Sequence, residues 1–372
     1  MKNKDMVSQI GLDNHKKFSK ATARDRAGKI VWRQRLDHRD RQGLRHRLAE
    51  WPKGTPVILE ASFGWSWMSD ELQDAELHPH LANTKKVAGW RKARGLSKSD
   101  RSDADLLSEL WSQKEPWWKV WLAPPQVRQR REWLRYRVNL VGMQTALKNR
   151  IQSILHYHGI LHEYSDLFGV QGRRFLNLLI SDKDITLAES ARASAKGYLQ
   201  LLDHVRRQIA KVTRRFRREV TKTPAARRLT TIPGIGWILA YTILAEIGDI
   251  KRFRNAKHLA SYCLLVPRAH DSGKEGQDDQ PMGRHVGRVG RRTLKWAFIE
   301  AAHGAVRKGG RFRALFDRRT NQGKRDRNRG YIAVAHELAR LVYVLLTKET
   351  NYMEQAPQRP GSRTVASRPE AG

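Results

Sequence analysis

The chain has 372 residues, enough for two or three domains with hydrophobic cores of their own. Lys and Arg number 72 against 37 Asp and Glu, a formal net charge of +35, and folding requires no such excess, so the charge indicates a polyanionic partner. The single cysteine, Cys263, excludes a disulfide scaffold and a cysteine-ligated zinc site. Neither a membrane-length apolar run nor a signal peptide is evident, and we expect a soluble, cytoplasmic protein.

The N-terminal part of the chain is predicted to be an α/β domain. Runs of β-branched and apolar residues indicate an antiparallel meander of three strands, and the alternation that follows is typical of a ribonuclease-H-like sheet. The predicted strands are 7–13, 16–28 (with a turn), 29–36 and 56–60, and the predicted helices are 40–51, Trp65 to Ala75 and 103–111.

Four acids in this domain are candidate metal ligands. Asp13 and Glu60 close two predicted strands, where a buried carboxylate needs something to offset its desolvation. Asp100 and Asp103 stand three apart and share a face at the entry of a helix. Together they can hold two Mg²⁺ ions about 3.5 to 4 Å apart, the arrangement that stabilises phosphodiester transfer. The alternatives are solvated strand ends for the first pair and compensation of the helix dipole for Asp103.

Two long amphipathic helices are predicted next. The first, within 127–159, carries its apolar stripe at Leu140, Met143, Leu147, Ile151 and Ile154. The second runs from Leu187 to Val220, and its stripe is Tyr198, Leu201, Val205, Ile209, Val212 and Phe216. The two are expected to form an antiparallel coiled-coil arm, which either packs within one chain or dimerises. The end of the chain, rich in Pro, Ser, Gly and Arg, is expected to be disordered.

The segment 229-LTTIPGIGWILAYTILAEIGDIKRF-253 predicts a tight turn followed by a helix that starts at Gly236. Because Gly234 and Gly236 carry no Cβ, a phosphate oxygen can approach their amides, helped by the positive end of the helix. This predicts a helix-hairpin-helix clamp on nucleic acid, and the alternative is a turn that packs internally. Basic runs at 206–218, 284–292 and 318–329 suit more than one phosphate track, on one long duplex or on two nucleic acids.

Several motifs together resemble the DEDD transposases of the insertion-sequence one-ten family, over nearly the whole chain. They are IGLDNHK, VILEAS, KSDRSDADLL, IPGIGWILAYTILAEIGDIKRF, SYCLLVP, DSG, RHVGRVGRRTLK and AVAHELARLVYVLL. The resemblance implies a RuvC-like domain over 1–115, a helical coiled-coil region over 116–222, a mainly helical C-terminal transposase domain over 223–352 and a disordered tail over 353–372. The chain departs from the family pattern at three places: Leu264 replaces a usual glycine, the loop 274-KEGQDDQPM-282 is unusually acidic beside a supposed DNA contact, and Arg288 replaces a usual lysine. The departures concern loop geometry.

The resemblance also assigns site residues. Asp13, Glu60, Asp100 and Asp103 become the metal-binding acids, and Ser272, in HDSGK, becomes the nucleophile that attacks DNA. Taken alone, a loop Ser-Gly pair more often forms a turn. The residues expected to contact nucleic acid are Gly234, Gly236, Lys274, Arg284, Arg288, Arg291 and Arg292.

Family members are thought to be guided by a structured bridge RNA whose loops pair with donor and target DNA, and to act as tetramers made of two dimers. The resemblance therefore implies an RNA-guided, serine-dependent, metal-assisted DNA recombinase at the nucleoid of a prokaryote. Two other classes of function remain open. A RuvC-like junction resolvase would use water as the nucleophile, and a non-catalytic nucleic-acid-binding protein would need neither the acids nor the serine.

Overall fold

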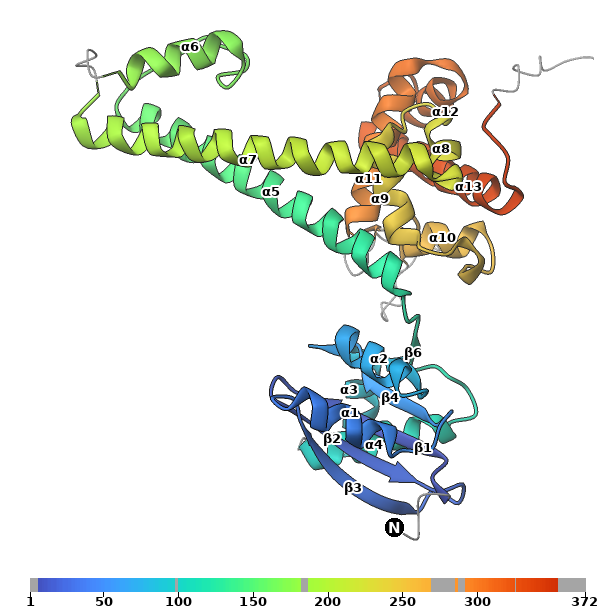
Figure 1. The fold of residues 1–372 in the computed structure, drawn as a ribbon. Helices are drawn as coiled ribbons and strands as arrows, with labels where there is room; N and C mark the ends of the chain where they lie inside the picture. The colour runs from blue at the N-terminus through green and yellow to red at the C-terminus, as the bar shows by residue number, and fades with distance from the viewer. Residues whose placement is uncertain are drawn as a thin grey trace, which may run out of the picture. The chain divides into compact units, whose positions relative to one another are not determined.

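The computed structural model describes residues 6–97, 100–181, 187–268, 285–286, 292–324 and 326–353, with the backbone alone at 100–102, 267–268 and 285–286. Within it the chain divides into two compact units, Met1–Ala123 and Pro124–Gly372 (Figure 1). The first unit is a mixed α/β structure and the second is mostly helical, as the sequence predicts.

One sheet of six strands, in the order β3-β2-β1-β4-β5-β6, organises the first unit. The predicted meander is confirmed, since β2 pairs antiparallel with both β1 and β3, whereas β4 runs parallel to β1 and to β5. The strands are β1 (Gln9–Asn14), β2 (Phe18–Arg24), β3 (Ile30–Asp37), β4 (Pro56–Glu60), β5 (His78–Ala82) and β6 (Lys119–Val120). The helices are α1 (Arg41–Ala49), α2 (Trp65–Asp74), α3 (Thr84–Ala93) and α4 (Asp100–Glu109).

Helices cover both faces of this sheet, which explains the unbroken apolar run in β4. Val57 and Leu59 pack into the core that α1 and α2 close, together with Ile10 and Leu12 of β1. The side chain of Ile58 points to the opposite face and packs with residues of α3 and α4. A strand buried on both faces needs apolar side chains in both directions, so the residues of β4 show no alternation of polarity.

The second unit consists of a long helical arm and a compact helical body (Figure 1). Its helices are α5 (Pro125–Tyr157), α6 (Val170–Leu179), α7 (Glu189–Lys222), α8 (Pro224–Thr230), α9 (Trp237–Ile247), α10 (Ala256–Tyr262), α11 (Arg292–Lys308), α12 (Gly310–Thr320) and α13 (Arg327–Lys348). A two-stranded sheet joins β7 (Pro267–Arg268) to β8 (His285–Val286). Among the described helices, α13 alone has the length and apolar composition of a membrane span, but its apolar residues pack into the core of the body.

The arm is formed by α5 and α7, which lie side by side in antiparallel directions (Figure 1). Arg130, near the start of α5, bonds to Glu219, near the end of α7, with an Nε to Oε1 distance of 2.6 Å. The predicted stripes are correct at most positions and wrong at two, because Met143 and Leu201 are each 55% exposed. In α7 the buried stripe runs through Leu202, one residue further on, so that the apolar face follows α5 along the whole arm.

The glycine-rich turn between α8 and α9 is held against α11. Gly234 has a φ of +86°, and a Cβ at this position would lie 2.2 Å from the carbonyl oxygen of Ala301 and 2.5 Å from the amide of Ala305. Its Cα also sits 2.9 Å from where a Cβ on Gly304 would be. The missing side chain of Gly234 therefore makes room for the backbone of α11, and the expectation that it makes room for a phosphate is corrected. Gly236, as predicted, is the residue from which α9 starts, and no atom lies within 4 Å of its Cβ direction.

We predict that Gly234→Ala destabilises the protein by roughly 3 kcal/mol, because it combines an unfavourable positive φ with a clash against rigid backbone. Gly236→Ala is the matched control, with an expected change under about 1 kcal/mol. Urea unfolding followed by circular dichroism measures both variants. Equal stability of the two variants would contradict the packing role of Gly234.

Candidate active site

Asp13 and Glu60 lie at the same edge of the central sheet. The parallel register of β1 and β4 pairs Gly11 with Ile58 and Leu12 with Leu59. Asp13 and Glu60 each follow that last pair by one residue, so they stand at the carboxyl ends of adjacent parallel strands. Because side chains alternate along a strand, both carboxylates point to the face opposite Leu12 and Leu59.

That face is the one covered by α4. Gly11 touches the helix so closely that an added Cβ would lie 2.2 Å from the amide of Ser108 and 2.3 Å from the carbonyl of Ala104. Asp13 is two residues beyond Gly11 and therefore lies on the same side of the sheet. At the start of β1, Gln9 donates from Nε2 to the carbonyl oxygen of Ser108, late in α4. The helix thus runs antiparallel to β1, and its N-terminal turn lies toward the strand end that carries Asp13.

The other two candidate acids are in that N-terminal turn. Asp100 is the first residue of α4, and its side chain lies outside the described residues. Asp103 is 13% exposed, and its Oδ1 lies 2.8 Å from Nη2 of Arg91 on α3. Its carboxylate therefore lies on the α3 flank of the helix, the side that packs over β4 through Ile58. The four acids come from three elements that meet at one edge of the sheet.

Asp105 serves a different purpose on the same helix. Its Oδ1 accepts a hydrogen bond of 2.7 Å from Thr22 and one of 2.9 Å from Nε of Arg33, on the flank that covers β2 and β3. Burial raises the pKa of this carboxyl, but the hydrogen bonds from Arg33 and Thr22 outweigh it and leave the pKa of Asp105 below its usual value. Asp105 anchors α4 to the meander, a role that residue spacing left unassigned.

The carboxylates at this edge of the sheet have the donor chemistry of a divalent-cation site, but the described ones do not form a complete ligand set. Asp13 is only 16% exposed, and His15 Nε2 lies 2.9 Å from its Oδ2. Oxygen donors from carboxylates at two strand ends and a helix entry are the ligands that hard divalent ions take in proteins. Among the described side chains no three His, Cys, Asp or Glu groups by themselves form a metal cluster. The structure therefore does not gather Asp13, Glu60 and Asp103 into one ligand set, and the side chain of Asp100 lies outside the described residues.

A buried polar network behind the strand end was missed by sequence reasoning. Ser19, fully buried, donates to Oδ1 of Asn14 at 2.7 Å and lies 2.7 Å from Nε2 of His38. Asn14 in turn donates from Nδ2 to the carbonyl of Phe63, in the loop that follows β4. Desolvation by burial lowers the pKa of His38, which favours its neutral form. The network ties the segment after Asp13 to the segment after Glu60, and nothing in the spacing of these residues predicts it.

The remaining predicted residues belong to the second unit. Gly234 and Gly236 flank Ile235 in the turn before α9, and Arg292 is exposed at the start of α11. Ser272, Lys274, Arg284, Arg288 and Arg291 lie outside the described residues.

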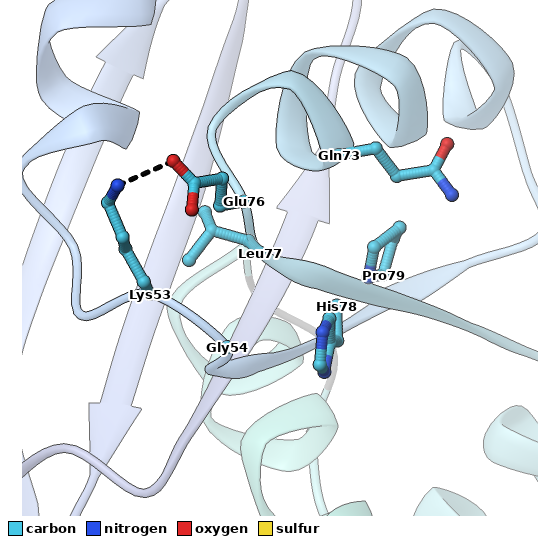
Figure 2. Close-up of a pocket in the computed structure, with 7 residues that line it drawn as sticks. All are labelled: Lys53, Gly54, Gln73, Glu76, Leu77, His78 and Pro79. Carbon is cyan, nitrogen blue, oxygen red and sulfur yellow. Dashed lines mark hydrogen bonds and ion pairs between the residues drawn. The ribbon is translucent and has the colours of Figure 1, made fainter.

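A surface hollow of about 550 Å³ lies away from the acids, at the opposite edge of the sheet (Figure 2). Gly54 and Leu77 line it, and they precede β4 and β5, so it lies at the amino ends of the parallel strands. Two of its lining residues pair with each other, with Nζ of Lys53 2.5 Å from Oε1 of Glu76 (Figure 2). With its cation already paired and no cluster of acids, this hollow has no chemistry to add to the site.

The chain is similar to known proteins over both units. A transposase family model of the DEDD type matches residues 10–159, and the model described as the transposase IS116/IS110/IS902 family matches residues 226–317. A transposase for insertion sequence element IS1111A from Coxiella burnetii is 24% identical over 93% of this chain and 91% of its own length. A probable family 20 transposase from Pseudomonas aeruginosa is 28% identical over 95% and 99%, respectively. A pilin gene-inverting protein from Moraxella bovis is 33% identical over 32% of this chain and 35% of its own.

Proposed function

Because the chain belongs to the IS110 family of DEDD transposases, we propose that it is an RNA-guided DNA recombinase that cuts and rejoins strands through a serine-DNA intermediate. The observation that carries the catalytic part is the placement of Asp13 and Glu60 at the carboxyl ends of adjacent parallel strands, under the entry of α4. Enzymes of the DEDD type depend on divalent metal ions.

In this proposal Asp13, Glu60, Asp100 and Asp103 hold two Mg²⁺ ions. When bound, the ions polarise the scissile phosphate and lower the pKa of a nearby hydroxyl. The protein contributes a rigid set of oxygen donors. The sheet fixes Asp13 and Glu60, and Arg91 orients Asp103 through their 2.8 Å contact. The network of Asn14, Ser19 and the Phe63 carbonyl keeps the two strand ends together.

Ser272 is the proposed nucleophile. Its Oγ forms a bond to the phosphorus of the scissile phosphodiester while the bond from phosphorus to one deoxyribose oxygen breaks, and the released oxygen takes up a proton. Attack by a deoxyribose hydroxyl of the exchanged strand reverses the step, rejoins the DNA and releases the serine. No external energy source is needed, because one phosphodiester is conserved as another.

The proposed domain division, guide RNA and oligomeric state are taken from the resemblance to the family. We propose that the first domain, 1–115, is RuvC-like, that the helical region 116–222 is the coiled-coil link, and that 223–352 is the serine transposase domain. A bridge RNA carries sequence specificity by pairing with donor and target DNA, and the active form is a tetramer made of two dimers. The formal charge of +35 and the absence of a cysteine-ligated zinc finger suit a protein that binds backbones and leaves base recognition to RNA.

Guide reprogramming tests this function. We expect that changing the target-pairing loop of the RNA encoded beside the gene abolishes insertion at the original site and directs it to a DNA site complementary to the new loop. Sequencing of insertion junctions in cells measures this. Insertion that continues at the original site, with the same frequency and without the RNA, would refute RNA guidance and leave the transposase assignment intact.

A further inference from the structure

A cationic pocket of about 710 Å³ opens in the helical body, where the end of α7, the α8–α9 turn and the end of α11 meet. Its charged members are Arg217, Arg227 and Lys308, and all three are exposed. They come from α7, α8 and α11, helices that are distant in sequence. The pocket therefore forms only in the folded body and is not a by-product of one basic run.

No acid neutralises this charge among the residues that the structure describes. The lining contains no Asp or Glu, and none of the three cations forms an ion pair with a described carboxylate. Neighbouring arginines behave differently, since Arg130 and Arg228 are paired with Glu219 and Glu349. Three cations that converge on a hollow without a counterion repel one another, and a bound anion relieves this.

The floor of the pocket adds backbone donors and an aromatic ring. Gly236 is the N-cap of α9, and no side chain caps the first amides of that helix. The Cβ direction of Gly236 is open, so an oxygen can reach those amides from the pocket. Half-buried Trp237 supplies an apolar wall beside them. Gly234, by contrast, is packed on α11 and only shapes the turn.

We propose that this pocket, formed by Arg217, Arg227, Lys308 and the N-terminal amides of α9, is a binding site for consecutive phosphates of a nucleic-acid backbone. Three cations contributed by three helices suit a run of phosphates better than one small anion, and half-buried Trp237 offers a face for a sugar or base. This inference rests on the proposed function, because it takes nucleic acid to be the substrate. Of the three cations in the pocket, Arg217 belongs to the basic run 206–218, whereas Arg227 and Lys308 lie outside all three basic runs.

Salt-dependent binding of the full-length chain tests the site. The triple variant Arg217→Gln, Arg227→Gln, Lys308→Gln is compared with a control that removes three exposed cations elsewhere, Arg174→Gln, Lys196→Gln, Arg254→Gln. Fluorescence anisotropy with a labelled 30-base-pair DNA duplex and with a labelled RNA hairpin gives the slope of log K against log salt. The slope is negative, and each lost phosphate contact is expected to reduce its magnitude by about 0.9 for duplex DNA or about 0.7 for single strands.

We expect the pocket variant to reduce the magnitude of the slope by roughly 2 units on at least one probe, and the control to reduce it by less than half as much. A change on DNA alone assigns the pocket to DNA, and a change on RNA alone assigns it to RNA. Equal changes for the pocket and control variants on both probes would overturn the proposal. Because the readout is binding, failure here is separable from failure of the recombinase function, which is scored by strand exchange.

A second variant keeps every charge. Gly236→Ala adds a methyl group to the pocket lining at the N-cap of α9, at a position where it meets no protein atom beyond its chain neighbours. We expect a several-fold weaker affinity with unchanged thermal stability. Unchanged affinity would remove the amides from the site.

Discussion

Asp13→Asn and Glu60→Gln are each expected to reduce strand cutting and transposition by more than about 100-fold while leaving nucleic-acid binding within a factor of a few. Each substitution removes the negative charge of a proposed metal ligand at a strand end that the sheet holds in place. Loss of a partner that only supports a metal ligand already costs about 10- to 100-fold, so loss of a ligand itself should exceed that range. Cleavage of labelled DNA by the purified protein with its guide measures the effect.

Asp105→Asn is the matched control. Asp105 lies on the same helix as Asp103 and is held by hydrogen bonds, but its partners are Thr22 and Arg33 on the other flank. We expect a modest loss of stability and retained cutting. Cutting abolished equally by all three substitutions would show that the acids act through the fold and not as ligands.

Ser272→Ala is expected to abolish the covalent protein-DNA adduct completely and to leave RNA binding unchanged. In the proposed reaction the hydroxyl oxygen of Ser272 bonds to phosphorus, and the methyl group of alanine provides no substitute. Trapping the reaction on a cognate substrate and resolving the products on a denaturing gel measures the adduct. Ser261→Ala, an exposed serine in the same unit, is the control and should leave the adduct intact.

The same gel separates the alternatives. Free DNA ends without an adduct in the wild type would support water as the nucleophile, as in a junction resolvase. A persistent adduct in Ser272→Ala would assign the bond to another residue.

Part of the sheet was predictable because local patterns determine it, whereas β5, α3 and β6 were not predicted. The meander, the buried strand at 56–60 and the helices around it follow from apolar periodicity and turn residues, and the structure confirms them with shifts of a few residues. The placement of Asp13 beside Glu60 needs one further fact, the parallel pairing of β1 with β4, which no local pattern contains. Motif resemblance supplied that information indirectly.

Other features depend on tertiary contacts and could not be predicted. The sequence pattern around Gly234 predicts an open glycine that binds phosphate. In the structure Gly234 packs against α11, about 70 residues further along the chain. Leu201 and Leu202 differ by one residue, and only the path of α5 along α7 decides which is buried. The pocket of Arg217, Arg227 and Lys308 is assembled from three helices, and only Arg217 belongs to a predicted basic run.

The most direct test of the metal site is uptake of Mn²⁺, a paramagnetic substitute for Mg²⁺, by the purified full-length chain, followed through the loss of the free-ion signal in electron paramagnetic resonance. We expect uptake of Mn²⁺ by the wild type and by Asp105→Asn, and loss of uptake in the double variant Asp13→Asn, Glu60→Gln. Equal uptake by the wild type and the double variant would contradict the claim that these two strand ends hold the ion.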